Sequence, residues 1–173
     1  MYLTAIRASA AFAILLSFTC SASVIAAPLP PPNGDVLLTV DGEITNTNTG
    51  TTAEFALADL EAMAQVSLKT STPWTTGVTT FEGVPLSTLL KTVGASGARI
   101  DAAALNDYAV SFPIADENGV DPLIAYKING AYIPIREKGP LWIIYPFDEN
   151  TRLQSEVYYA RAIWHLDRLA IKP

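Results

Sequence analysis

The sequence predicts an α+β domain with a mixed, mostly antiparallel sheet and a few short helices. Many short strand-like runs are separated by Gly, Pro and Asn turn signals. Only two or three short segments place apolar residues at helical spacing. The chain has 173 residues, of which 50% are hydrophobic and 16% are charged, a balance that suits one domain with a single core.

The first 26 residues are expected to be a signal peptide that is cleaved after Ala26. A short segment with one positive charge, Arg7, precedes an apolar run over residues 8–18. An uncleaved membrane anchor is the alternative, although this run is short for a membrane span. Residues 27–34 then form a Pro-rich, extended leader, and residues 35–173 form the domain.

In the first half of the domain, residues 36–40 are expected to form a strand, because β-branched and aliphatic residues dominate them. Asp41-Gly42 predicts a tight turn, with a returning strand over residues 43–46. Residues 55–63 carry apolar side chains at helical spacing, which predicts a helix. A strand over residues 66–69 follows.

Residues 69–90 are the stretch around which we expect a ligand to bind. A polar, hydroxyl-rich run with one large residue, Trp74, follows a strand; a Gly turn at residue 83 and Pro85 then introduce a helix that ends near Val93. A strand, a polar loop and a helix start often hold a ligand against backbone donors. An ordinary connection between a strand and a helix is the alternative.

The second half of the domain is expected to contain mainly strands. They are predicted over residues 108–112, 123–128, 141–145, 158–164 and 168–171, and residues 100–105 lead into the first of them. Asn129-Gly130 predicts a hairpin after the second of these strands, because Asn and Gly adopt the positive φ angles that such a turn needs. No internal repeat is visible.

Several spaced blocks resemble sulfite-oxidase-type molybdopterin-binding domains, in the same order along the chain. The blocks are TSTPW at residues 70–74, FEGVPLSTLL at 81–90, DYAVSFP at 107–113, IAYKING at 124–130 and GPLWIIYP at 139–146. The resemblance runs from about residue 35 to the end of the chain. It implies the sulfite-oxidase-like molybdopterin-binding fold, in which the first block carries a cysteine that ligates molybdenum.

Three departures from that family concern the cofactor. Thr70 stands where the family has its metal-ligating cysteine, and a hydroxyl is a poor ligand for a metal that prefers thiolates. Trp142 replaces the Arg of the family's GPLR block. An Arg side chain binds phosphate strongly, because it can donate two parallel hydrogen bonds. Glu137 stands where the enzymes often carry a His.

Cysteine, histidine and charge exclude several other functions. The single cysteine, Cys20, lies in the signal peptide, and the mature chain keeps one histidine, His165, so disulfides and a Cys/His metal cluster are excluded. His165 is expected to be an ordinary hydrogen-bonded sheet residue. The net charge of −6 and the absence of a basic run make nucleic acid an unsuitable partner.

These departures point to a non-phosphorylated pterin without metal, with a tetrahydro form among the options. A carboxylate at Glu137 can accept the paired donors of a pterin ring, and aromatic side chains can stack on its face. The residues expected to bind the ligand are Thr70, Thr72, Trp74, Tyr108, Arg136, Glu137, Lys138 and Trp142. The alternatives are that Trp142 is a core residue, that Tyr108 only anchors a strand end, and that residues 136–138 form a solvated charged turn.

The resemblance also extends to small exported domains without the cysteine, the pterin-responsive regulators of Proteobacteria. It implies a non-catalytic pterin-binding protein of the periplasm that engages the periplasmic domain of a membrane diguanylate cyclase/phosphodiesterase and so tunes cyclic-di-GMP and biofilm formation. A molybdopterin-dependent oxidoreductase of the sulfite oxidase family, lacking the Cys ligand, is the alternative. In a third reading, Trp74 and Trp142 fill the pocket and the domain is an interaction module only.

Overall fold

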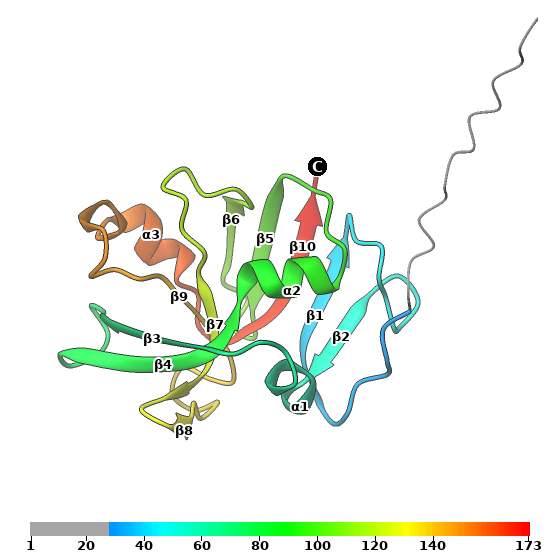
Figure 1. Cartoon of the computed structure of the whole chain (residues 1–173), viewed down its shortest axis with the longest axis horizontal. Coiled ribbons are helices and arrows are strands. Elements are labelled where there is room, and N and C mark those ends of the chain that lie inside the picture. The colour runs from blue at the N-terminus through cyan, green and yellow to red at the C-terminus, as the bar shows by residue number, and fades with distance from the viewer. Residues whose placement is uncertain (1–27) are drawn as a thin grey trace, which may run out of the picture.

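The computed structural model describes residues 28–173 (Figure 1). The expected signal peptide, residues 1–26, lies outside the described residues, as does the first residue of the leader. The rest of the leader lies against the domain: the backbone N–H of Leu29 donates to the carbonyl of Thr47 at 3.0 Å, and the Asn48 amide donates to the carbonyl of Pro30 at 2.9 Å. None of the helices in the described part combines the length and apolar character of a membrane-spanning helix.

The ten strands of the described residues form two sheets. The first has the order β2 (Ala53–Ala56), β1 (Val36–Gly42), β10 (Leu166–Lys172), β5 (Arg99–Ala104) and β6 (Ala109–Pro113). The second has the order β3 (Val66–Ser71), β4 (Val78–Pro85), β7 (Leu123–Ile128) and β8 (Ala131–Tyr132), and β9 (Trp142–Ile144) also pairs with β7. The β1–β10 pair is parallel and the other pairs are antiparallel.

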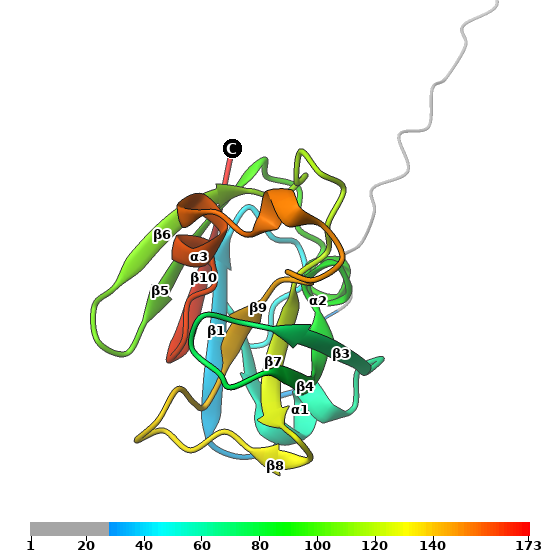
Figure 2. The same ribbon diagram turned by 90° about the vertical axis from the view of Figure 1, so that its left-hand side faces the viewer.

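Three short helices and one 3-10 turn complete the described residues. They are α1 (Leu57–Glu61), α2 (Leu86–Thr92), α3 (Glu156–Arg161) and the 3-10 turn Thr151–Leu153. Both views place α3 and the turn between β3 and β4 at the same end of the molecule (Figures 1 and 2). The predicted α+β class, with mostly antiparallel pairing and few helices, is therefore confirmed.

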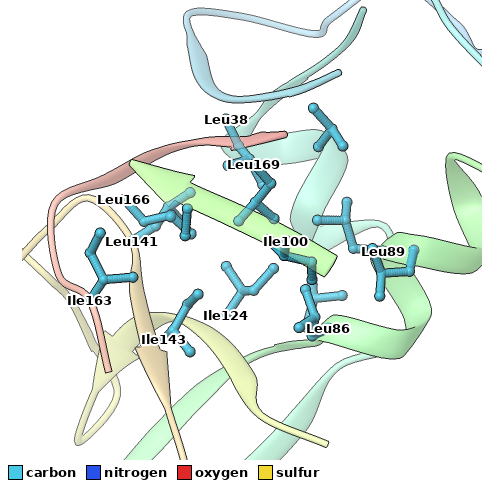
Figure 3. Packing of buried hydrophobic residues seen from close by; sticks show 14 of the residues in the cluster. Leu38, Leu86, Leu89, Ile100, Ile124, Leu141, Ile143, Ile163, Leu166 and Leu169 are labelled. Carbon is cyan, nitrogen blue, oxygen red and sulfur yellow. The ribbon is translucent and has the colours of Figure 1, made fainter. Parts of the chain in front are cut away.

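The main hydrophobic core lies between the two sheets and beneath α2. Leucine and isoleucine side chains from both sheets meet there, as Figure 3 shows for Leu38, Ile100, Ile124 and Leu169, and Leu89 joins them from the helix. All five side chains are fully buried. Alternating residues of β1 and β5 supply this core, because successive side chains of a strand point to opposite faces.

A second, smaller apolar cluster belongs to the second sheet. Its buried members are Phe81, Leu123, Ala125, Ile133, Trp142 and Ile144. Strand β9 contributes to both clusters, since Ile143 faces the main core while its neighbours Trp142 and Ile144 belong to the smaller cluster. This burial on both sides explains why residues 141–145 form a continuous apolar run.

Two glycines have roles that the local sequence did not predict. Instead of ending a strand at a tight turn, Gly42 completes β1 beside β10, and a Cβ there would lie 2.0 Å from the carbonyl oxygen of Ile171. Gly83 lies inside β4, not in a turn, and a Cβ would lie 2.0 Å from the carbonyl oxygen of Ile124. Both positions need glycine because a neighbouring strand approaches closely.

The expected strand over residues 158–164 is wrong, because most of this segment is helix α3. Ser155 precedes the helix in an extended conformation, and its carbonyl accepts a hydrogen bond from the N–H of Tyr159. The aromatic and aliphatic residues of this segment favour strands, but here packing against β6 and the core decides the conformation. Helix α2 begins at Leu86, with Pro85 as its N-cap and the last residue of β4.

Two buried tyrosines provide a test of this core. The Tyr126 hydroxyl is buried without a hydrogen-bond partner among residues 28–173, whereas the Tyr158 hydroxyl donates to Asp116 Oδ2 at 2.8 Å and accepts from the Asn118 amide at 2.7 Å. Removing an unpaired buried hydroxyl relieves a desolvation cost, so Tyr126→Phe should stabilise the fold by up to about 1 kcal/mol. Tyr158→Phe should destabilise it by about 1.5–3 kcal/mol, because it loses bonds to a charged and an amide partner. Urea unfolding measures both; a larger loss in Tyr126→Phe than in Tyr158→Phe would contradict this packing.

Candidate functional site

Thr70, at the end of β3, is fully buried. Its Oγ1 accepts a hydrogen bond from the backbone N–H of Asp148 at 3.2 Å and donates to the carbonyl of Ser71 at 3.2 Å. The side chain thereby joins β3 to the segment that follows β9. Its hydroxyl is occupied as both donor and acceptor, so Thr70 acts in the structure as a link between two chain segments.

The turn from Thr72 to Gly77 connects β3 to β4 and presents Trp74. Thr72 Oγ1 accepts from the N–H of Trp74 at 3.2 Å and lies 2.9 Å from Thr75 Oγ1. Gly77 adopts a positive φ of 66°, which completes the turn. Thr72 is nearly buried, and the contacts of its side chain fix the backbone of this turn.

Trp74 is the centre of an aromatic cluster in which every ring meets it edge to face. The ring centroids lie 5.8 Å from it in Trp142, 6.5 Å in Phe147, 5.7 Å in Tyr159 and 5.5 Å in Trp164. Pairs of this geometry contribute about 0.5–1.5 kcal/mol each beyond the area that they bury. The ring of Trp74 is therefore held by neighbours from several separate segments, although the residue itself is only half-buried.

One hollow lies beside Trp74 on the side of residues 133–138; we call it the Glu137 hollow. It has a volume of about 350 Å³ and is lined by Trp74, Thr75, Ile128, Ile133, Glu137, Lys138 and Trp142. Four of the eight residues expected to bind a ligand therefore share one cavity. Glu137 is exposed, and its carboxylate has no hydrogen-bond or ion-pair partner among residues 28–173.

Lys138 brings a cation to the same hollow. Its Nζ lies 4.2 Å from the ring centroid of Trp164 and 5.5 Å from that of Trp142, which are cation–π distances. The loop that carries Lys138 is held by His165. The ring Nδ1 of His165 lies 2.6 Å from the carbonyl oxygen of Gly139, and its backbone N–H donates to the carbonyl of Lys138. His165 adopts a positive φ of 56°, so it supports this loop from an unusual backbone position just before β10.

Trp142 is fully buried and also lines the hollow. Its Nε1 donates to the carbonyl of Ala162 at 3.0 Å, and its backbone forms a bridge with Trp164. Its burial is that of a core residue, as the alternative expected. Its ring forms the inner wall of the cavity, and a role in binding a ligand remains a prediction.

A second hollow lies on another side of Trp74; we call it the Tyr108 hollow. Its volume is about 210 Å³, and it is lined by Trp74, Asn106, Tyr108, Tyr159, Ala160, Ala162, Ile163 and Trp164. Tyr108 is 46% exposed and donates its hydroxyl to the carbonyl of Ala160 at 3.1 Å, so it does anchor the start of β6 against α3. Trp74 is the wall that the two hollows share, with Trp142 on one side and Tyr108 on the other.

The remaining predicted residues lie outside both cavities. Arg136 is exposed and lines neither hollow. Thr70 and Thr72 also line neither one, because their side chains hold the backbone beneath the Trp74 turn. Their roles as ligand contacts remain predictions, and the geometry gives the two threonines a supporting position.

Trp164 and Tyr159, which complete the aromatic cluster, are not among the residues that the sequence predicts for the site. Both lie in the segment that was expected to be a strand, where alternation would have separated their side chains. The helical turn and the bridge between Trp142 and Trp164 bring them to Trp74. The available signal was composition, because Trp164 is one of only three tryptophans in the chain.

The model of the oxidoreductase molybdopterin-binding domain family matches residues 31–152. The chain belongs to this family. The two sheets and three short helices of the described residues agree with the sulfite-oxidase-like fold that the motifs predicted. Members of the molybdopterin-binding family are domains for a pterin-type cofactor. No curated protein matches the chain.

The molybdenum-bearing form of the family's cofactor does not fit the residues of this site. Thr70, which the motifs align with the metal-ligating cysteine, is fully buried, and its hydroxyl is hydrogen-bonded in both directions. No group of three or more His, Cys, Asp or Glu side chains within residues 28–173 is arranged to hold a metal ion. The position that the motifs align with the family's cysteine therefore offers no thiolate to molybdenum.

Asp148 closes the end of β3 and can be followed by titration. Its carboxylate accepts hydrogen bonds from the Ser71 hydroxyl and from the Ser71 backbone N–H, at 2.6 Å for the latter, and these bonds lower the pKa of Asp148. A carboxyl whose pKa is lowered by folding stabilises the fold above its unfolded pKa, and this contribution is lost as the pH falls.

Ser71→Ala removes the stronger of the two causes, so the pKa of Asp148 should rise part of the way to its ordinary value. The backbone N–H still donates, so the recovery should be partial. The acid-unfolding profile of Ser71→Ala should also depend less on pH below about pH 4. Carboxyl carbon NMR titration measures the pKa, and Ser67→Ala, an exposed serine on the same strand, is the matched control. An unchanged pKa in Ser71→Ala would disprove this contact.

Proposed function

We propose that the protein is a non-catalytic pterin-binding protein and that the pterin ring occupies the Glu137 hollow. The observation that carries the proposal is one cavity of about 350 Å³ whose lining includes a free carboxylate, two tryptophans and a cation that lies over a tryptophan ring. Ligand cavities typically combine apolar and aromatic walls with a few polar groups that set orientation. Membership of the molybdopterin-binding family supports a pterin as the ligand class.

The polar groups of the hollow match the edges of a pterin. The 2-amino group and N3–H of the ring form two parallel donors, which the carboxylate of Glu137 can accept together. Lys138 is available to the ring carbonyl or to a hydroxylated side chain of the pterin. Trp74 supplies an aromatic wall for the flat heterocycle.

The same groups favour a pterin without phosphate. An exposed carboxylate at Glu137 repels a phosphate group, and Trp142 takes the position of the family's phosphate-holding Arg. The proposed ligand is therefore a non-phosphorylated pterin, with tetrahydro forms included. The oxidoreductase alternative needs a metal held by the cofactor's own sulfurs alone, since Thr70 is engaged in hydrogen bonds within the protein.

We further propose that the protein acts in the periplasm, after removal of residues 1–26, and that it signals to the periplasmic domain of a membrane diguanylate cyclase/phosphodiesterase. The resemblance to exported pterin-responsive regulators supports this step. By linkage, a pterin changes cyclic-di-GMP synthesis or breakdown, and with it biofilm formation, only if the bound and free forms differ in affinity for that partner.

Trp74→Ala tests the proposed ligand site. Loss of one stacking partner should lower the affinity for a tetrahydropterin by about 1–3 kcal/mol, which is about five- to 150-fold. Glu137→Gln should also weaken binding, because a neutral amide accepts the two ring donors less strongly. Anaerobic isothermal titration measures both variants, with Glu117→Gln, an exposed acid outside the hollow, as the control.

Absence of any affinity of the wild-type protein for reduced pterins would remove the proposal. If Trp74 and Trp142 instead fill the pocket of an interaction module, Trp74→Ala should lower stability, and no pterin should bind to the wild-type protein or to the variant. Thermal unfolding of the same samples separates the two outcomes.

A further inference from the structure

Strand β3 has an open edge. It is the terminal strand of the second sheet, and its partner β4 lies on one side only. Thr80 of β4 directs its backbone groups toward the other neighbour, because its N–H donates to Asn129 Oδ1 at 3.1 Å and its carbonyl accepts from the Asn129 N–H at 2.8 Å. Lys69 pairs with Thr80, so Lys69 is at a non-hydrogen-bonded position of the ladder, and its N–H and C=O point away from β4.

The same orientation recurs every second residue along β3. Ser71 confirms it, because its outward N–H donates to Asp148 Oδ2 at 2.6 Å. Ser67 and Lys69 have no such partner: no hydrogen bond from residues 28–173 satisfies their outward N–H and C=O groups. Four adjacent backbone groups are therefore available to an additional strand, and Asp148 sets the limit of this edge.

A groove runs beside this edge; we call it the β3 groove. Its volume is about 450 Å³, and its lining residues are Val66, Leu68, Pro85, Asn118, Gly119, Val120, Asp121, Leu123, Pro146, Glu149, Asn150 and Leu153. The lining combines apolar side chains from four segments with polar residues. An added strand would place every second side chain toward this groove.

The negative charge of the groove favours a basic segment as its occupant. Asp121 and Glu149 are its charged residues and both are exposed, while no Lys or Arg lines it. Asp148, beside Ser71, adds a third carboxylate, whose lowered pKa favours its ionised form. Lys69 belongs to the opposite face from Leu68, because neighbouring side chains of a strand alternate.

These charges disfavour a second copy of this chain as the occupant. The chain has a net charge of −6, and pairing of two β3 edges would bring one Lys69 close to the other. Lysine on an edge strand commonly prevents pairing between identical sheets. A basic segment from a different protein avoids both the repulsion between two acidic chains and the repulsion between two Lys69 side chains.

We propose that β3 receives an extended segment of another protein as an added strand. Alternate residues of that segment face the β3 groove and are apolar or basic, so that they contact Leu68 and the carboxylates of Asp121 and Glu149. Backbone hydrogen bonds to Ser67 and Lys69 supply the pairing, as in other cases of strand addition. Neither Ser67 nor Lys69 lines the Glu137 hollow, so this interaction does not depend on the proposed function. Because β3 leads directly to Thr70 and the Trp74 turn, it also provides a physical connection to the Glu137 hollow.

A phage-displayed library of random dodecapeptides, selected on the full mature chain, tests the proposal. Selected peptides should alternate apolar or basic residues with other residues. For a synthetic selected peptide, hydrogen-exchange NMR should show new protection of the Ser67 and Lys69 amides. Glu149→Lys should weaken binding about three- to tenfold, whereas Glu43→Lys, the same charge change at an exposed site outside the groove, should not.

Lys69→Pro removes an outward N–H that takes no part in the β3–β4 ladder, so the variant should fold and lose peptide binding. Circular dichroism checks the fold, and Glu149→Lys provides the same test without a backbone change. Failure to select any peptide overturns the proposal, as does protection of amides elsewhere with Ser67 and Lys69 unchanged. Concentration-dependent dimerisation through this edge, measured by analytical ultracentrifugation, would assign it to a second copy and also overturn the proposal.

Discussion

The hydrogen bonds between the end of β3 and Asp148 are the constraint on which the site depends. The Thr70 hydroxyl accepts from the Asp148 backbone, and the Asp148 carboxylate accepts from both donors of Ser71. These contacts join residues that lie 77 and 78 positions apart in the sequence. The Trp74 turn begins directly after this junction, so its position is determined by the segment that follows β9. A side chain that ligates molybdenum at this point would need a free thiolate; here it is a buried hydroxyl that is hydrogen-bonded within the protein.

Around that junction, the protein combines an aromatic framework with a small number of charges. Trp74, Trp142 and Trp164 come from three distant parts of the chain, and their mutual edge-to-face contacts leave cavities beside Trp74 instead of filling the space completely. Lys138 lies over two of these rings, and Glu137 is adjacent to it in sequence. A cavity of this kind is suited to a flat heterocycle with donors on one edge, and it offers neither a thiolate nor an arginine for a metal-bearing, phosphorylated cofactor.

The elements that could be predicted from sequence are those in which local signals and long-range packing agree. The hairpin at Asn129-Gly130 is an example, because both residues adopt the positive φ angles that its composition predicts. The predictions that are wrong concern positions where contacts with a distant segment determine the backbone conformation. Gly83 indicated a turn but lies in β4, since the approach of Ile124 leaves no room for a Cβ. Residues 158–164 have strand-forming side chains but contain helix α3. The comparison with the family predicted the fold and four residues that line the Glu137 hollow. The contribution of Trp164, and the position of Tyr108 in a different hollow, depend on tertiary packing alone.

The most direct test of the central claim, a pterin site without metal, is the composition of the protein as it is made in a cell. The protein should be purified anaerobically from the periplasm of a bacterial host that synthesises molybdopterin. Released small molecules can then be identified by mass spectrometry, and molybdenum can be quantified in the same sample. The account predicts an equimolar, non-phosphorylated pterin with molybdenum far below equimolar. Equimolar molybdenum, released together with molybdopterin, would contradict it.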